Sequence, residues 1–310
     1  MGKIMAICIS PQRGTQKEPV QQAQFTPEWG IVGDAHGGNW HRQVSLLGLE
    51  KIEAFRERGA QVKFGDFGEN LVVSGFDFRN LPVGTLLQCG EVILEMTQIG
   101  KECHSHCRIY HAVGDCIMPR EGVFARVLHG GTISTGDELT LLPRSEPRPW
   151  QAAVITLSDK GSIGERRDES GPAIVERLSA NGYEIIEQLL LPDDRARLEK
   201  ELIRLCDQRH PDLILTTGGT GFSGRDVTPE ATLAVAERQA PGIAEAIRAA
   251  SLKITPRAML SRGVSVIRGN TLIINLPGSP KAVRESMDVF LDTIPHAMEL
   301  LRGAVADCAR

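Results

Sequence analysis

The pattern of apolar and polar positions changes character near the middle of the chain. Before residue 143, short apolar runs alternate with glycine. Two of these runs, Thr85–Gln88 and Glu91–Glu95, flank Cys89-Gly90, and a glycine between two such runs indicates a β-hairpin. Leu139–Leu142 predicts a closing strand, whereas only Gly48–Arg58 has the spacing of an amphipathic helix. This pattern predicts a mainly β domain, built as a barrel or a sandwich.

After residue 149, strand-like and helix-like segments alternate. The Asn181-Gly182 pair predicts the end of the first helix, and the second helix carries a stripe of leucines. Alternation of this kind predicts an α/β domain with a mostly parallel sheet between helices, and a site at the carboxyl ends of its strands. The predicted strands are 152–157, 183–191 and 212–216, the helices are 171–180 and 195–209, and a late hairpin joins 264–267 to 271–275.

The boundary between the two parts is predicted at residues 143–149, where three prolines in seven residues resist helix formation. With 310 residues the chain has room for two domains, which we predict at 1–145 and 150–310. The composition, with 41% hydrophobic and 24% charged residues, is that of a globular protein. The net charge of −4 gives no bulk attraction to nucleic acid or to acidic lipid. We therefore expect neither nucleic acid nor membrane as a partner.

The N-terminal residues lack the long apolar core of a secretory signal, and no apolar run is long enough to span a membrane. The chain has seven cysteines, an odd number, of which five precede residue 120. Reduced thiols in the cytoplasm fit this pattern best, and clustered Cys and His in that compartment suggest chemistry more than disulfides.

The most informative segment is the glycine-rich loop at residues 216–230. It contains G-x-G-x-x-G at Gly219, Gly221 and Gly224, but a dinucleotide-binding fingerprint follows the first strand of its unit. Here the loop follows the third strand, and a helix is expected only at Thr228, with Pro229 at its first position. We therefore favour an anion-binding loop made of backbone N–H groups. The hydroxyls of Thr216, Thr217 and Thr220 would add donors, although glycines also serve plain turn geometry.

Other loops are expected at the same edge of the sheet. The first strand runs into Ser158-Asp159, the second into Asp193, and the loop at 275–280 precedes a helix. In the glycine loop itself, Arg225 could neutralise a phosphate and Asp226 could hold Mg²⁺. One such Asp alone is more often a helix cap, but several acid-bearing loops at one edge predict a site for a phosphorylated ligand.

These residues carry a family resemblance that covers nearly all of residues 151–303. The motifs that carry it are, in chain order, SDKGS, LLPDD, TTGGTGFSGRDVTPEAT, PGIAEAIR and NLPGSP. With these motifs the segment resembles the MogA/MoaB family, which includes molybdopterin adenylyltransferases and a domain of gephyrin. The resemblance implies that the phosphate of molybdopterin attacks the α-phosphorus of ATP with the help of Mg²⁺. It places the essential carboxylates, which are also the Mg²⁺ ligands, at Asp193 and Asp226. It predicts cofactor-binding residues at Ser158, Asp159, Thr217, Gly218, Gly219, Thr220, Gly221, Arg225, Thr228, Glu245, Pro277, Gly278 and Ser279.

A second constellation is the cysteine- and histidine-rich segment at residues 100–116. Its two closest cysteines, Cys103 and Cys107, are four residues apart with histidines between them, which is not a usual zinc spacing. Zinc binding, ordinary buried thiols and one reactive thiolate all stay open, and we favour the thiolate. Lys101 and the neighbouring histidines could lower its pKa, and thiolates are nucleophiles and soft-metal ligands.

The first 143 residues resemble a MOSC domain, the module found at the C-terminus of molybdenum-cofactor sulfurases. The motifs that carry the resemblance are GDAHGG, FGENL, GTLL and Thr97-Gln98, in that order, and Gly136-Asp137 before the last strand. By its distance from Thr97-Gln98, the key cysteine of the family falls on Cys103, with Cys107 as a rival. The resemblance implies that Cys103 carries sulfur as a persulfide or ligates a molybdenum ion.

Together the two resemblances predict a MOSC-like barrel followed by a three-layer MogA/MoaB-like domain. The expected function is molybdenum cofactor biosynthesis, with ATP, Mg²⁺ and molybdopterin as the small molecules and other proteins of the pathway as partners. A homo-oligomer, most simply a trimer, is also implied. The alternatives are a non-catalytic binding, carrier or scaffold protein, and an enzyme whose chemistry resides in the MOSC-like half. The sequence leaves open whether the metal is molybdenum or tungsten. It also leaves open which compound donates the sulfur and which enzyme accepts the cofactor.

Overall fold

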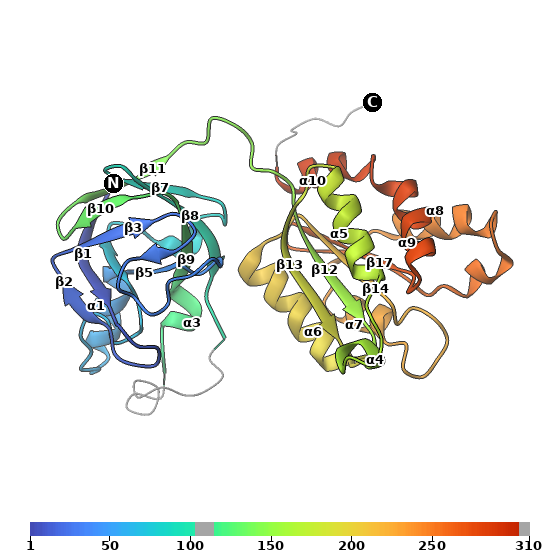
Figure 1. Ribbon diagram of the computed structural model, residues 1–310, viewed down its shortest axis with the longest axis horizontal. Coiled ribbons are helices and arrows are strands. Elements are labelled where there is room, and N and C mark those ends of the chain that lie inside the picture. Colours follow the sequence, from blue (N-terminus) through green and yellow to red (C-terminus); the bar gives the residue numbers. More distant parts are fainter. Residues whose placement is uncertain (103–114, 304–310) are drawn as a thin grey trace. The chain divides into compact units, whose positions relative to one another are not determined.

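The computed structural model describes residues 1–102 and 115–303 and divides into two compact units, Met1–Arg148 and Pro149–Arg310 (Figure 1). Cys103 and Cys107 lie outside the described residues. Each unit has its own sheets and its own hydrophobic core.

The first unit is a closed β-barrel. Its seven strands follow the order β11-β7-β8-β9-β5-β6-β1, and β1 pairs with β11 to close the barrel. Only the pair β5–β6 is parallel. The barrel strands are β1 (Gly2–Ile9), β5 (Val44–Gly48), β6 (Leu71–Ser74), β7 (Leu86–Cys89), β8 (Val92–Ile99), β9 (Val123–His129) and β11 (Glu138–Leu142). The remaining elements are β2 (Glu18–Val20), β3 (Gln22–Thr26), β4 (Gly30–Ile31), β10 (Gly131–Ser134), α1 (Leu49–Glu57), η1 (Phe78–Asn80) and α3 (Met118–Glu121).

Alternating burial along the strands explains the barrel. In β1, Ile4 and Ile7 contribute to the main core cluster, whereas Ala6 and Cys8 join a second cluster that includes Ile52 of α1. A strand whose two faces are both covered in this way is favoured inside a barrel with a helix packed outside. The predicted hairpin is confirmed as β7 and β8, and the predicted helix is confirmed as α1. The short helices α3 and η1 were not predicted.

The second unit is a three-layer α/β domain with a six-stranded sheet in the order β13-β12-β14-β17-β16-β15 (Figure 1). The first four strands in this order are parallel, and β16 and β15 are antiparallel to the strands beside them. The strands are β12 (Gln151–Leu157), β13 (Glu184–Leu191), β14 (Leu213–Thr217), β15 (Arg238–Gln239), β16 (Ser265–Arg268) and β17 (Thr271–Leu276). The helices are α4 (Asp159–Ser162), α5 (Ser170–Ala180), α6 (Arg195–Arg204), η2 (Leu205–Arg209), α7 (Thr228–Ala234), α8 (Pro241–Leu252), η3 (Pro256–Leu260), α9 (Pro280–Phe290) and α10 (Ile294–Leu301).

Two separate clusters cover the two faces of this sheet. One contains Ile174 of α5 and Met287 of α9, and the other contains Leu198 of α6 and Ala231 of α7. Successive residues of the fully buried strand β12 belong alternately to these clusters, because side chains of a strand alternate between the two faces. The mostly parallel sheet between helices is therefore confirmed.

Two details of the helices differ from the prediction. The helix expected over 195–209 continues past Arg204 as a π-helical turn, and the wider turn keeps both Leu205 and Cys206 buried. At the glycine loop, α7 begins at Thr228 as predicted, but Thr228 is the first helical residue and not the cap. Its hydroxyl donates to the carbonyl of Gly218 (2.9 Å), so it holds the loop instead of closing the helix.

Candidate functional site

Four loops meet at the carboxyl edge of the parallel strands. They follow β12, β13, β14 and β17, and they begin at Ser158, Pro192, Gly218 and Pro277. In the sheet, β12 lies between β13 and β14. The loops after β13 and β14 approach each other across it, since a methyl group at Gly219 would lie 3.2 Å from Oδ1 of Asp193.

These loops enclose a cleft of about 240 Å³. Seven of the residues predicted to bind substrate or metal line it, namely Ser158, Asp193, Thr217, Gly218, Gly219, Asp226 and Gly278. Further lining residues were not predicted, namely Thr156, Leu157, Gly161, Arg166, Arg167, Asp168, Glu169, Ser170 and Pro280.

Two glycines of the loop are required by steric fit. Gly218 and Gly219 have φ of +93° and +63°, which side chains rarely adopt. A Cβ at Gly218 would lie 2.3 Å from the carbonyl oxygen of Leu157, and one at Gly219 would lie 2.4 Å from Oγ1 of Thr228. Turn geometry therefore accounts for these two glycines, independently of any ligand.

The same loop also leaves backbone donors without acceptors. In the described part of the chain, no group accepts a hydrogen bond from the N–H of Gly219, Thr220 or Gly221. Consecutive N–H groups of this kind form a concavity that suits an anion. The loop thus meets the requirement for phosphate binding through its backbone.

Hydroxyl donors contribute less to this loop than the sequence suggested. The hydroxyl of Thr217 donates to the carbonyl of Pro277 (2.6 Å), and Oγ1 of Thr216 accepts a hydrogen bond from Asn275 (2.9 Å) on the buried side of the strand. Both threonines tie β14 to β17. Thr220 is largely buried, and its carbonyl accepts from the N–H of Arg262.

Three aspartates lie around the glycine loop. Asp159 and Asp193 form a reciprocal pair of hydrogen bonds, in which the backbone N–H of each donates to the carboxylate of the other at 3.0 Å. Asp226 accepts from the N–H of Ser223 through Oδ2 (2.7 Å), and this oxygen lies 3.0 Å from a Cβ built at Gly221. No described residue donates to Oδ1 of Asp193 or Oδ1 of Asp226. Each of the two carboxylates therefore keeps one oxygen available for a ligand.

The charges of these aspartates are not equivalent. Burial raises the pKa of the Asp193 carboxyl, and the negative charges of Asp159 and Asp226 raise it further against the backbone hydrogen bond from Asp159. The pKa of Asp159 is lowered instead, chiefly because Arg225 donates to its carboxylate. A cation beside Asp193 and Asp226 would relieve the repulsion that Asp193 experiences.

The residues present fit Mg²⁺ as part of a metal–phosphate complex. The described residues contain no cluster of three His, Cys, Asp or Glu side chains able to hold a metal alone. Mg²⁺ usually needs only one or two carboxylates when substrate phosphates and waters complete its octahedron. The available oxygens of Asp193 and Asp226 supply those carboxylates.

Arg225, which was predicted to bind the phosphorylated ligand, pairs with an aspartate of the protein. Its guanidinium binds both carboxylate oxygens of Asp159, at 2.7 and 3.0 Å, and it does not line the cleft. A phosphate would have to compete with the Asp159 carboxylate for this guanidinium. No local pattern indicates this pairing, because 66 positions separate the two residues.

The remaining predicted residues lie around the cleft. The carbonyl of Pro277 accepts from Thr217, and the side chain of Ser279 caps α9 by accepting from the N–H of Ala282 (3.2 Å). Glu245 is exposed on α8 and does not line the cleft. The structure therefore brings the predicted carboxylates and the glycine loop together but leaves Glu245 outside.

Asp168 is the main residue that the sequence analysis missed. Its Oδ1 accepts from the N–H groups of Ser170 and Gly171, both at 3.0 Å, and its Oδ2 accepts from the hydroxyl of Thr156 (2.8 Å). The hydroxyl of Ser170 in turn donates to the carbonyl of Gly278 (2.8 Å). Asp168 thereby connects three sides of the cleft. An Asp shortly before Ser-Gly-Pro is a helix-cap signal that could have been recognised.

In the first unit, two of the sequence motifs meet in the interior. Lys17 is buried with its ammonium group on the carboxylate of Asp34, which also accepts from Asn70 (3.0 Å) and from the backbone N–H of His36 (2.9 Å). Burial opposes ionisation of Asp34, but hydrogen bonds from His36 and Lys17 outweigh it and lower the pKa of that carboxyl. The motifs GDAHGG and FGENL are therefore linked by a buried, charged network.

Glu69 in the second of these motifs is expected to make the barrel sensitive to pH. Its side chain is buried and Oε1 accepts from the N–H of Gly65 (2.7 Å), whereas Oε2 has no hydrogen-bond partner among the described residues. Burial raises the pKa of this carboxyl from 4.5 to about 7. The folded state then holds the proton more tightly than the unfolded state, so the free energy of unfolding falls as pH rises from about 4.5 to about 7.

Glu69→Gln should remove this fall. Calorimetry of the full chain at pH 5 and pH 8 measures the effect, and the barrel transition of the parent should melt at lower temperature at pH 8. The transition of the variant should shift much less between the two pH values. Equal shifts in parent and variant would show that Glu69 is ionised at both pH values.

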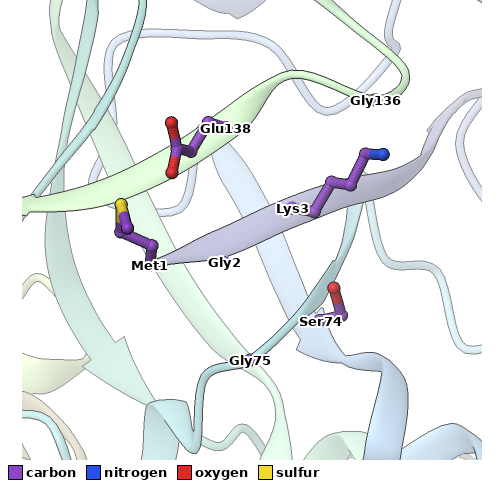
Figure 2. A pocket seen from close by; sticks show the side chains of 7 residues that line it. All are labelled: Met1, Gly2, Lys3, Ser74, Gly75, Gly136 and Glu138. Carbon is purple, nitrogen blue, oxygen red and sulfur yellow. The ribbon is translucent and has the colours of Figure 1, made fainter.

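The other hollow of note lies at the start of β1, has a volume of about 370 Å³ and is shown in Figure 2. Its charged side chains are Lys3 and Glu138, which are paired in the register of β1 and β11. The two side chains point in different directions (Figure 2), and we assign no chemistry to this hollow.

The cysteine segment is described only at its edges. Cys103, Cys107, His104, His106 and His111 lie outside the described residues. Beside them, the hydroxyl of Thr97 donates to the carbonyl of His41, Gln98 donates to the carbonyl of Gly100 (2.7 Å), and Cys116 is buried. The three interpretations of this segment, a zinc site, ordinary thiols and a reactive thiolate, therefore rest on the sequence alone.

The fold and the cleft define a class of protein: an α/β domain that presents a glycine-rich anion loop and carboxylates at the carboxyl edge of a parallel sheet, preceded by a β-barrel. Two family models match the chain. One, described as a probable molybdopterin binding domain, matches residues 131–296, and the other, described as a MOSC domain, matches residues 33–140. The chain belongs to the molybdopterin-binding domain family of molybdenum cofactor biosynthesis, with a MOSC domain before it.

Individual relatives match the second half of the chain. A molybdopterin adenylyltransferase of Helicobacter pylori strain J99 is 44% identical over 152 residues, which is 48% of this chain and 86% of that protein. A molybdopterin adenylyltransferase of Escherichia coli K12 is 40% identical over 171 residues, covering 50% of this chain and 87% of that protein. A solved structure of the molybdopterin biosynthesis enzyme MoaB from Thermus thermophilus is 47% identical, with a TM-score of 0.48, and covers 50% of this chain and 97% of that one.

Among the described residues, no helix combines the length and the apolar character needed to cross a membrane.

Proposed function

We propose that residues 150–310 transfer the adenylyl group of ATP to the phosphate of molybdopterin. One observation carries the proposal. Asp193 and Asp226 hold available oxygens beside the free N–H groups of residues 219–221, in a domain whose relatives are molybdopterin adenylyltransferases. Carboxylates that place a metal and N–H groups that hold phosphate are the parts that nucleotidyl transfer needs.

The reaction conserves atoms and charge without a protein nucleophile. A phosphate oxygen of molybdopterin forms a bond to the α-phosphorus of ATP, and the bond from this phosphorus to the bridging oxygen breaks. The electron pair leaves with pyrophosphate. When bound, Mg²⁺ would neutralise phosphate charge and would be held by Asp193 and Asp226. The loop at residues 218–221 would orient the phosphates through its N–H groups, and Arg262 fixes that loop by donating to the carbonyls of Gly221 (2.6 Å) and Asp226 (2.5 Å).

For the MOSC domain we propose that Cys103 handles sulfur as a persulfide or ligates molybdenum. The support is its position after Thr97-Gln98 and the resemblance in which a cysteine has this role. In the described residues Cys8, Cys89 and Cys206 are free thiols, which suits work in a reducing cytoplasm. Other proteins of the cofactor pathway would then supply sulfur or receive the product.

The decisive test is incubation of the purified chain with molybdopterin, ATP and Mg²⁺, followed by mass analysis of the pterin and assay of pyrophosphate. Adenylylated molybdopterin with equimolar pyrophosphate is the expected result. Tight binding of molybdopterin with no product over many hours would favour the carrier or scaffold alternative. Omission of Mg²⁺ should abolish product, because the carboxylates alone leave the phosphate charge uncompensated.

We also expect the chain to form a homotrimer through its second unit, by analogy with the family to which it is similar. Light scattering at micromolar concentration measures the mass directly, and the expected value is three times that of one 33.8 kDa chain. A stable monomer over a range of concentrations would contradict the prediction.

A further inference from the structure

Two arginines line the cleft without a partner. Arg166 and Arg167 stand in the segment before α5, and both side chains are exposed. No group in the described part of the chain accepts a hydrogen bond from either side chain or forms an ion pair with it. An exposed arginine at a cleft with no internal partner keeps its full charge and its donors for a ligand.

The other arginines around the glycine loop are already engaged. Arg225 is bound by both oxygens of Asp159, and Arg262 donates to the carbonyls of Gly221 and Asp226. If either guanidinium turned to a ligand, these hydrogen bonds within the protein would be lost. Neither one is therefore a free cation for the cleft.

The N-terminus of α5 does not offer an alternative anion site. Asp168 already accepts from the N–H groups of Ser170 and Gly171, and Pro172 has no N–H. The carboxylate also places a negative charge at the positive end of this helix. An anion on this side of the cleft must therefore be held by side chains, and Arg166 and Arg167 are the cationic ones that line it.

We infer that Arg166 and Arg167, and not Arg225, bind a phosphate group of the substrates. The inference rests on the proposed function and adds to it the residues that supply positive charge. A guanidinium matches phosphate oxygens with two parallel N–H donors, so two adjacent arginines can hold one phosphate in a fixed orientation. Two sources share this chemistry, namely the triphosphate of ATP and the terminal phosphate of molybdopterin.

The test is the double variant R166Q/R167Q in the full chain, measured by calorimetric titration with ATP and Mg²⁺ and, separately, with molybdopterin. At least one of the two dissociation constants should rise by about tenfold or more, because the double variant loses charge-assisted hydrogen bonds to the phosphate. The wild-type affinity for that ligand should also fall more steeply with added salt than the affinity of the variant. The ligand that weakens identifies the source of the phosphate.

Two single variants serve as controls. R257Q removes the same charge from an exposed position of the same unit, outside the cleft, and should change neither constant by more than about twofold. R225Q should weaken binding less than the double variant, because Arg225 is held by Asp159. Unchanged affinities for both ligands in R166Q/R167Q, or a larger loss in R225Q, would overturn the inference.

The outcome is separable from that of the proposed function. If the wild-type chain binds both ligands without turnover and the double variant loses one of them, the adenylyl transfer fails as a proposal and the arginine site stands. If the wild-type chain makes adenylylated product and the double variant binds and turns over normally, the function stands and the arginine site fails.

Discussion

Replacing Asp226 or Asp193 with Asn should reduce adenylyl transfer at least about a hundredfold while the fold survives. Each carboxylate has one oxygen that accepts a backbone N–H and one that is available to a ligand. Asn retains an oxygen that can accept the backbone hydrogen bond, but it removes the charge that would place Mg²⁺ and balance the phosphates. Loss of one preorganised group of this kind costs on the order of 10²–10³ in rate.

The two variants should differ in their stability. Asp193 is half-buried, and Asp159 and Asp226 repel its charge, so its removal also relieves a local repulsion. We therefore expect D193N to lose rate but to gain slightly in stability, whereas D226N loses rate alone. Initial rates as a function of Mg²⁺ and thermal denaturation of both variants measure this.

Asp194 offers a matched control beside the site. It is exposed, it does not line the cleft, and its carboxylate caps α6 by accepting from the N–H of Arg197 (2.8 Å). Asn caps a helix as well as Asp does, so D194N should turn over almost normally. If D193N and D226N match this control, the two carboxylates have no part in the transfer.

The sequence was sufficient for much of this fold because its strongest signals are local. Strand β12 is a continuous buried run, and Asn181-Gly182 ends α5 where predicted. The position of the cleft also followed from chain order alone, since parallel strands bring their carboxyl ends to one edge.

The sequence was insufficient where distant residues compete for partners. Nothing local shows that β12 lies between β13 and β14. Nor does any local pattern show that Arg225 pairs with Asp159, while Arg166 and Arg167 have no side-chain partner in the part of the chain that the structure describes. A charged side chain can be assigned to a ligand only after its partners within the protein are known. For the same reason the glycine loop was predicted correctly in position, but its threonine hydroxyls turned out to hold β17 in place.

The two units should also be separable in function. Cys103→Ser is expected to abolish loading of sulfur or molybdenum on the MOSC domain and to leave adenylyl transfer nearly intact. Ser keeps the approximate size of the side chain but forms neither a persulfide nor a soft thiolate ligand at neutral pH. The cleft with Asp193 and Asp226 is built wholly from the second unit, which has its own core, so a change in the first unit should not disturb it.

Cys107→Ser is the matched control, and it should load normally if Cys103 alone is the carrier. Persulfide is measured by mass analysis after incubation with a sulfur donor, bound molybdenum by elemental analysis, and adenylyl transfer in the same preparations. Simultaneous loss of bound zinc and unfolding of the barrel in both variants would favour a structural zinc site instead. Full loading of C103S would show that this cysteine is not the carrier. If C103S also lost adenylyl transfer, the two units would be coupled, because the cleft is lined by residues of the second unit.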